Sequence, residues 1–163
     1  MRADDVIRDA EGAGDIAAAR RLFEEYAASI GVDLCFQHFA EELGGLPGDY
    51  SPPRGCLLLA MQDERPVGCV ALRPLDGDGA VGEVKRLYVQ PRGRGTGLGR
   101  RLAQAVIERA RSIGYHELKL DALAGMTQAR ALYASLGFRE CAAYYDNPLP
   151  GVAYLSLSLV SEA

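Results

Sequence analysis

The glycine- and arginine-rich stretch at residues 91–99 limits the possible folds more than any other part of the sequence. The segment 82–89 precedes it and is predicted as a β-strand. A helix is predicted directly after it, at 98–112, because apolar residues repeat every four positions from Leu98. The stretch therefore joins a strand to a helix N-terminus, where unpaired N–H groups and the helix dipole favour an anion.

The composition of this turn suits a phosphate-bearing ligand. Its glycines permit positive φ and let the main chain approach an anion without an intervening Cβ. Four arginines, Arg92, Arg94, Arg100 and Arg101, surround it in a chain whose net charge is −4. The glycines run G-x-G-x-G, unlike the G-x-G-x-x-G of dinucleotide folds, and no lysine follows them as a P-loop requires. The alternative is a basic turn that only caps the helix.

The length and composition of the chain favour one globular domain. The chain has 163 residues, of which 48% are hydrophobic and 25% charged, so we expect a single domain over 1–163. A net negative charge argues against general nucleic-acid binding. No apolar run approaches the roughly 20 residues of a membrane span, and the N-terminus lacks a signal-peptide pattern, so we predict a cytoplasmic protein without membrane association.

No metal site is expected. The cysteines, Cys35, Cys56, Cys69 and Cys141, form no C-x-x-C pair, and the chain has only two histidines. Buried, reduced thiols are the simpler interpretation of these cysteines.

Hydrophobic periodicity predicts alternating strands and helices. Helices are expected at 15–30, 34–43, 98–112 and 126–136, and strands at 5–8, 56–61, 67–72, 82–89, 116–121, 138–145 and 152–160. Residues 46–55 contain three prolines and two glycines, which predicts a loop. Mixed strands and helices with several hairpins indicate an α/β fold with a partly antiparallel sheet.

On these residues the sequence resembles the GNAT superfamily of N-acetyltransferases. The signature of that family for acetyl-CoA, Q/R-x-x-G-x-G/A, is satisfied by Arg94-Gly95-Thr96-Gly97-Leu98-Gly99. The run at 85–89 resembles the strand before the signature. The run at 129–138 looks like the A-x-x-L-Y-x-x-x-G-F segment of the family, and the resemblance covers about residues 67–145.

The resemblance implies a mixed, mostly antiparallel sheet of six to seven strands, flanked by about four helices. Two central parallel strands, here 83–89 and 116–121, would splay apart, and the pantetheine of acetyl-CoA would lie in the gap. It would pair like an added strand with the main chain near Leu87, Tyr88 and Val89. The pyrophosphate would rest on the main-chain amides of Arg94, Gly95, Thr96, Gly97, Leu98, Gly99 and Arg100. Met126 stands where relatives often have an asparagine that contacts pantetheine.

The implied reaction is direct attack of an amine on the thioester, which requires a neutral amine. An amine with a pKa of about 10.4 costs about 4–5 kcal/mol to deprotonate at pH 7. A carboxylate, acting directly or through water, would ease this step. We predict that Glu83, at the start of one central strand, is the base. Asp121, at the end of the parallel partner strand, and a bound water are the alternatives.

The oxyanion and the departing thiolate also need hydrogen-bond donors. The resemblance points to the Val89 amide for the oxyanion and to Tyr133 for the sulfur. A phenol with a pKa of about 10 stays protonated at neutral pH, but full proton transfer to a thiolate is uphill by about 2 kcal/mol. We therefore expect Tyr133 to stabilise the thiolate by hydrogen bonding. No Ser-His-Asp or Cys-His pattern is present, in agreement with a mechanism without an acyl-enzyme.

We predict an acyltransferase that acetylates the primary amine of a small molecule or an amino acid. The segment 144–148 either walls the acceptor pocket or forms an ordinary turn. A first alternative is a protein lysine or N-terminal acetyltransferase, for which Glu41, Glu42, Asp49, Asp63 and Glu64 would form an acidic groove. A second alternative is a CoA-binding sensor or partner-binding module without catalysis. The sequence leaves the oligomeric state open between a monomer and a homodimer, and many relatives of this type are dimers.

Overall fold

The computed structural model describes residues 5–31, 33–34, 38–75 and 77–160. Four α-helices lie in these ranges: α1 (Gly12–Ile30), α2 (Phe39–Gly44), α3 (Leu98–Ile113) and α4 (Thr127–Ser135). The strands are β1 (Val6–Asp9), β2 (Cys56–Gln62), β3 (Arg65–Pro74), β4 (Val81–Val89), β5 (Glu117–Ala122), β6 (Arg139–Glu140) and β7 (Ala153–Ser158). The same described ranges contain 3-10 turns at Gly48–Tyr50 and Pro91–Gly93.

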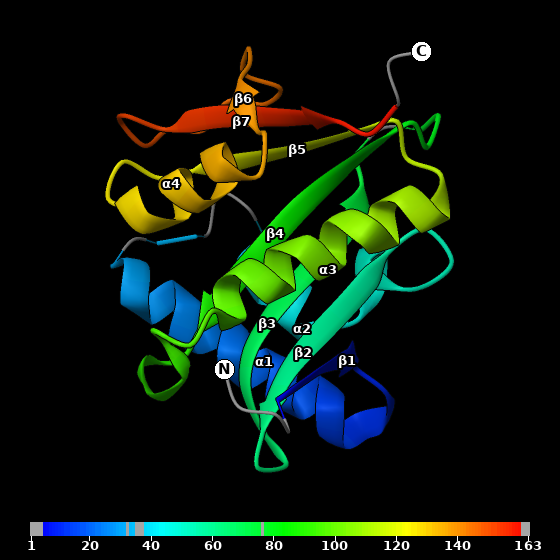
Figure 1. Ribbon diagram of the computed structural model, residues 1–163, viewed down its shortest axis with the longest axis vertical. Helices are drawn as coiled ribbons and strands as arrows, with labels where there is room; N and C mark the ends of the chain where they lie inside the picture. The colour runs from blue at the N-terminus through cyan, green and yellow to red at the C-terminus, as the bar shows by residue number, and fades with distance from the viewer. Residues whose placement is uncertain (1–4, 32, 35–37, 76, 161–163) are drawn as a thin grey trace.

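The strands form one seven-stranded sheet in the order β1-β2-β3-β4-β5-β7-β6. All neighbouring pairs among them are antiparallel except β4 and β5, which are parallel. This confirms the predicted mixed, mostly antiparallel sheet with a central parallel pair. Figure 1 shows β4 and β5 meeting at the upper right and parting toward the left.

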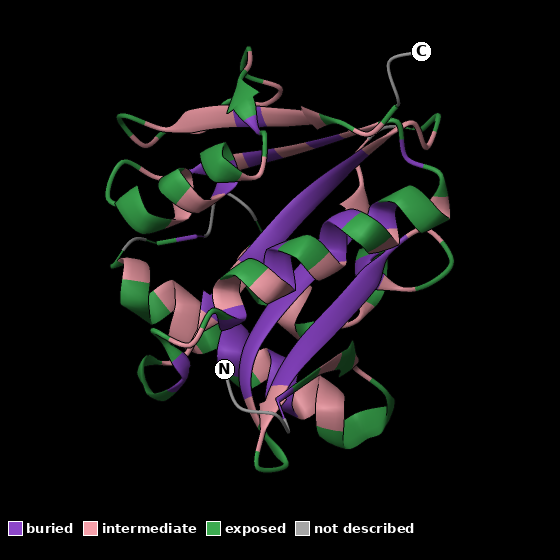
Figure 2. Cartoon of the chain, in the orientation of Figure 1, coloured by how far each residue is buried: buried purple, intermediate pink, exposed green. Residues whose placement is uncertain are grey.

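Helices cover both faces of the sheet, so the inner strands are buried on both sides. Leu58 and Ala60 pack on the α3 side, whereas Leu57 and Leu59 pack on the α1 side, as the alternation of a strand requires. Figure 2 shows β2, β3 and β4 almost wholly buried, whereas β6 is exposed and β7 is mostly of intermediate burial. The two-sided burial explains why the sequences of β2 and β3 are continuous apolar runs.

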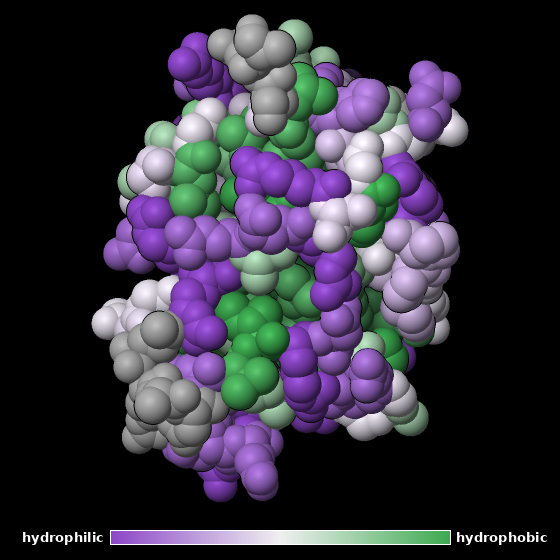
Figure 3. Space-filling view, turned by 45° about the vertical axis from the view of Figure 1, so that its right-hand side comes forward, coloured by the Kyte–Doolittle hydropathy of each residue, from purple (hydrophilic) through white to green (hydrophobic). Residues whose placement is uncertain are grey.

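The outer surface of α3 faces solvent. Arg100, Gln104, Glu108 and Arg111 are exposed there, and Leu102 and Val106 on the opposite surface of the helix are fully buried. Figure 3 shows hydrophilic side chains spread over this side of the molecule, between smaller hydrophobic patches. The four-residue apolar repeat of the sequence therefore marks the buried surface of α3, as predicted.

Several predicted boundaries are wrong. The strand expected at 138–145 is only two residues long, because Tyr144 and Tyr145 turn back over the sheet to donate hydrogen bonds. The helix expected from Asp15 begins at Gly12, and Asp15 accepts a hydrogen bond from the Glu11 amide inside the first turn. The helix expected at 34–43 runs over Phe39–Gly44, and residues 35–37, including Cys35, lie outside the described ranges.

Two of the other cysteines are buried as expected, and one is not. Cys56 and Cys69 are buried, whereas Cys141 is partly exposed.

No helix in the described part of the chain is both long and apolar enough to cross a membrane.

An irregularity in β4 sets the direction of the strand beside the gap. The β3–β4 register shifts between Cys69 and Ala71, and Arg86 adopts a positive φ of 62°. A left-handed conformation costs a non-glycine residue about 1–2 kcal/mol, so the surroundings must hold it. Arg86 donates two hydrogen bonds, of 2.9 and 2.8 Å, to the carboxylate of Glu42 in α2. The Arg86 side chain is only 2% exposed, so this ion pair is buried. The buried pair holds Arg86 in place and thereby fixes the bulge.

Replacing Glu42 with glutamine should therefore destabilise the fold. Glu42→Gln leaves a buried guanidinium without its charge partner, which should lower the free energy of unfolding by about 2–3 kcal/mol. The matched control is Glu41→Gln, because the Glu41 side chain is 76% exposed and its loss should cost less than about 0.5 kcal/mol. Urea unfolding of both variants gives the two values. Equal effects would contradict the role of the ion pair.

Candidate active site

The main-chain ladder between β4 and β5 stops early. The recorded pairs are Val81↔Glu117, Gly82↔Leu118 and Glu83↔Lys119, and the rest of β4 then diverges from β5. Beyond Glu83, main-chain groups of β4 thus face an opening instead of a strand. Backbone N–H and C=O groups need hydrogen-bond partners, so this edge suits a ligand that binds as an extended chain.

Side chains from several elements line the opening. A small cavity of about 40 Å³ lies where the strands part, and its wall includes Lys85, Asp121, Met126 and Tyr133. A larger cleft of about 520 Å³ adjoins it and shares four lining residues with it, namely Tyr26, Leu87, Met126 and Ala129. The two spaces together form a route from the surface to the end of the β4–β5 ladder.

The glycine-rich turn forms one end of the larger cleft. Gly95 and Gly97 have positive φ values of 76° and 82°, as expected for a turn that only glycine forms without strain. Gly97 is the N-cap of α3, and no side chain caps the helix there. The first N–H groups of α3 are therefore available to an anion.

Most residues predicted to bind the cofactor line this cleft. The lining includes Leu87, Tyr88, Val89, Arg94, Gly95, Gly97, Leu98 and Gly99. Arg94 donates a hydrogen bond of 2.9 Å to the Val89 carbonyl, which holds its guanidinium between the turn and β4. Two predicted residues point elsewhere: Thr96 donates to the Gly93 carbonyl, and the Arg100 side chain donates to the Ser135 hydroxyl.

Tyr133 projects from α4 into the wall of the small cavity. It is 7% exposed, and its ring packs edge-on against Phe138 at a centroid distance of 5.2 Å. The L-Y…G-F segment therefore places a tyrosine at the gap and a phenylalanine behind it. Burial raises the pKa of Tyr133 above its usual value, so the phenol remains a hydrogen-bond donor over the whole practical pH range.

The two candidate bases lie in different surroundings. Glu83 is 1% exposed. Its Oε1 accepts a hydrogen bond of 2.8 Å from Arg73 Nε and forms an ion pair with Arg73 Nη2, also at 2.8 Å, and its Oε2 accepts a hydrogen bond of 2.6 Å from the Tyr144 hydroxyl. It does not line the small cavity, so a proton could reach it only through another group. Asp121 does line that cavity, and its Oδ2 accepts hydrogen bonds from the Tyr145 hydroxyl and from Asn147 Nδ2.

The turn after β6 thus anchors both acids. Tyr144 donates a hydrogen bond to Glu83, and Tyr145 and Asn147 donate hydrogen bonds to Asp121. These bonds give the segment 144–148 a defined place beside the site. Burial, reinforced by the negative charge of Glu83, raises the pKa of Tyr144, so its hydroxyl stays protonated. The segment had been predicted only as a possible wall of the acceptor pocket.

Sequence reasoning missed the cations beside this site. Arg73 on β3 is partly exposed, whereas Lys85 and Arg86 on β4 are buried, at 8% and 4% exposure. Burial lowers the pKa of Lys85. A signal was present in the sequence, because the strand contains three charged residues, and Glu83 and Lys85 occur two residues apart and so share one face.

The acids proposed to form one groove do not lie together. Glu41, Glu42 and Asp49 line a groove of about 300 Å³ with Arg73, at the α2 side of the sheet. Asp63 and Glu64 instead form the turn between β2 and β3. A continuous acidic groove built from all five is therefore wrong.

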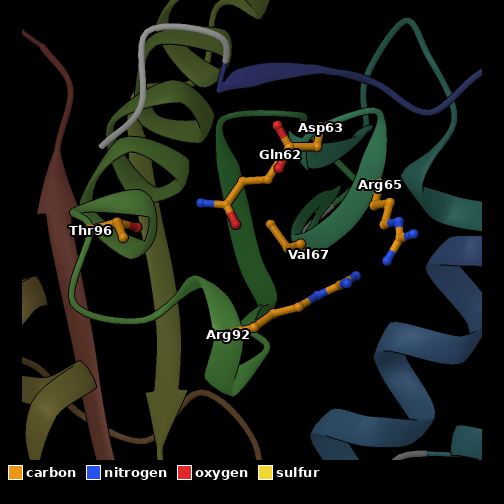
Figure 4. Close-up of a pocket in the computed structure, with 6 residues that line it drawn as sticks. All are labelled: Gln62, Asp63, Arg65, Val67, Arg92 and Thr96. Carbon is orange, nitrogen blue, oxygen red and sulfur yellow. The ribbon is translucent and has the colours of Figure 1, made fainter.

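A separate cavity of about 540 Å³ opens at the β2–β3 turn, away from the gap (Figure 4). Arg65 and Arg92 extend into it toward one another, and Thr96 borders it from the glycine-rich turn. Both arginines are exposed, and Arg92 donates to the Gln90 side chain. This cavity shares no lining residue with the two spaces at the gap. Within the described ranges, no three His, Cys, Asp or Glu side chains group as metal ligands.

Comparison with known proteins agrees with this geometry. The family model described as "Acetyltransferase (GNAT) family" matches residues 17–138. An N-acetyltransferase of Schizosaccharomyces pombe, named as uncharacterized, is 38% identical over 146 residues, which are 89% of each chain. The N-acetylaspartate synthetase of Rattus norvegicus is 38% identical over 107 residues, covering 66% of this chain and 35% of that protein. An acetyltransferase structure from Salmonella typhimurium with its cofactor acetyl-CoA has a TM-score of 0.70 at 22% identity, covering 99% of this chain and 97% of that one.

Proposed function

The chain belongs to the GNAT family of acetyltransferases, and we propose that it transfers acetyl from acetyl-CoA to the primary amine of a small molecule or amino acid. Family membership makes the chain an acyltransferase. The observation that carries the proposal is the open edge of β4, which lies between the glycine-rich turn and Tyr133. The rat relative is named for the synthesis of an N-acetylated amino acid, which supports a small acceptor.

The cleft has the features that a CoA thioester requires. Uncapped N–H groups at the start of α3 suit the pyrophosphate, and the unpaired edge of β4 suits the two amides of pantetheine. We propose that residues 94–100 hold the pyrophosphate through main-chain amides. Leu87, Tyr88 and Val89 are proposed to hold the amides of pantetheine. Met126 borders both spaces and replaces the asparagine of many relatives with an apolar contact. Acetyl-CoA supplies the activated acyl group.

The remaining residues of the site stabilise the charge that develops during the reaction and remove the proton of the amine. The Val89 amide is proposed to donate a hydrogen bond to the carbonyl oxygen under attack, and Tyr133 to donate one to the departing sulfur. The amine forms its new N–C bond as the C–S bond breaks, and it loses one proton. We propose that Glu83 draws this proton through the Tyr144 hydroxyl, which donates to Glu83 and can accept from the amine or an intervening water. Asp121 contacts the amine and is the alternative base.

Thiol release from acetyl-CoA tests the activity and the role of Tyr133 together. With a panel of small amines and amino acids, the wild-type protein should release CoA in an amine-dependent manner. Tyr133→Phe should lower kcat by about 10- to 100-fold, because it removes a donor used as charge develops, while the Kd for acetyl-CoA stays nearly constant. No release with any amine, despite tight CoA binding, would favour the sensor or binding-module alternative. An unchanged kcat in Tyr133→Phe would remove this residue from the mechanism.

Steady-state kinetics of two variants separates the two acids. Glu83→Gln should lower kcat by about 100-fold, as expected for the loss of a general base. Asp121→Asn should mainly raise the KM for the amine and change kcat much less. The reverse pattern would assign the base to Asp121.

A further inference from the structure

The acceptor side of the gap depends on a segment without regular secondary structure. Residues 141–152 connect β6 to β7 and carry hydrogen-bond donors to both acids, Glu83 and Asp121. A connecting segment of this kind keeps its side chains in place only when its main chain is held at several points. The contacts that attach it to the rest of the fold therefore decide how firmly the two acids are positioned.

Arg130 of α4 attaches the far end of this segment. Its Nη2 donates a hydrogen bond of 2.5 Å to the Gly151 carbonyl. The same Nη2 donates to the Ala122 carbonyl at 2.9 Å, and Nε donates to the Leu123 carbonyl at 3.1 Å. One side chain thus joins the end of β5 to the turn before β7. Arginine suits this role because its planar guanidinium presents several donors in fixed directions.

Close packing at Gly151 holds the same junction. Gly151 adopts a positive φ of 73°, and a Cβ atom at this position would lie only 2.9 Å from the Cβ of Ala124, in the loop after β5. Any larger residue would therefore be strained and would push the turn away from that loop. Hydrogen bonding by Arg130 and close approach at Gly151 fix the turn by two independent contacts.

The junction lies next to the groups that act on the acceptor. Ala122 directly follows Asp121 in the chain, and the turn that contains Gly151 begins at Asn147, which donates to Asp121 at 3.0 Å. Neither space at the gap has Arg130 among its described lining residues. Arg130 is therefore placed to act on the acids through the turn, without contact with acetyl-CoA or the amine.

We propose that Arg130 is a positioning residue of the acceptor side, which fixes the segment 144–151 on β5 so that its donors hold both acids for binding and deprotonation of the amine. Loss of Arg130 frees the turn and so displaces Tyr144 and Asn147 from the acids. A displacement of about 1 Å at a catalytic group is enough to lower a rate by about 100-fold. The inference rests on the proposed acetyl transfer and adds a residue that acts on it from outside the cleft.

A kinetic comparison tests the positioning role. Arg130→Met keeps a long side chain and removes every donor, so kcat/KM for the amine should fall by about 10- to 100-fold. The Kd for acetyl-CoA should change by less than about threefold, because the cleft wall is intact. Arg139→Met is the matched control, since Arg139 is exposed on β6, and its kcat/KM should stay within about twofold of wild type. An unchanged kcat/KM in Arg130→Met, or an equal loss of acetyl-CoA affinity, would contradict the proposal.

Two further variants separate positioning from a general effect on the fold. Arg130→Lys keeps the charge but replaces the fork by one nitrogen, so it should recover only part of kcat/KM. Gly151→Ala leaves Arg130 in place and should lower kcat/KM for the amine as Arg130→Met does. Gly14→Ala is its control, because a Cβ at Gly14 in α1 meets open space. Full recovery in Arg130→Lys, or wild-type kinetics in Gly151→Ala, would overturn the proposal.

Hydrogen exchange separates this inference from the proposed reaction, because it needs no turnover. In Arg130→Met, the amides of residues 144–151 should exchange at least about threefold faster than in the wild-type protein, and those of β2 at the same rate. If exchange changes in this way but the wild-type protein acetylates no amine, the proposed function fails and the attachment by Arg130 stands. If acetylation occurs and Arg130→Met alters neither exchange nor kcat/KM, the proposed function stands and the role of Arg130 fails.

Discussion

The structure depends on one interruption in main-chain pairing. β4 and β5 are parallel neighbours for three residue pairs and then separate, while each remains bonded on its other side, to β3 and to β7. The antiparallel neighbours therefore keep both strands in place while the edge between them stays open. A sheet paired throughout would leave no space for an extended ligand between its strands. Everything assigned to the site lies along this opening: the glycine-rich turn at one end, Tyr133 in its wall, and the acids near its base.

Electrostatics add a second requirement, since ionised groups occupy a region that is otherwise apolar. Glu83, Lys85 and Arg86 are all buried in the middle of β4. Such groups are tolerated when partners compensate their charge, and Arg73, Tyr144 and Glu42 do so for Glu83 and Arg86. The pairs join β3, β4, α2 and the turn after β6, so the groups that hold the acids in place also connect the elements around the acceptor side.

Local patterns in the sequence were sufficient to predict the glycine-rich turn and the helix after it, because both depend on residues close together in the chain. The central parallel pair and the place of Tyr133 followed instead from the family resemblance, since α3 separates β4 from β5 in the chain. The ion pairs could not be predicted, because Glu42 and Arg86 meet across 44 positions through packing that no local period encodes. The strand expected at 138–145 failed for a related reason. Its aromatic residues have high β-propensity, but Tyr144 and Tyr145 instead bond to acids on β4 and β5.

Hydrogen exchange measured by mass spectrometry, with and without acetyl-CoA, tests the central claim most directly. If the thioester ligand completes the open edge of β4, amides within Lys85–Val89 and residues 94–100 should exchange more slowly when it is bound. The paired strands β1 and β2, at the other edge of the sheet, should exchange at the same rate in both states. Saturating acetyl-CoA that leaves β4 and the glycine-rich turn unprotected, or that protects other segments instead, would contradict the account.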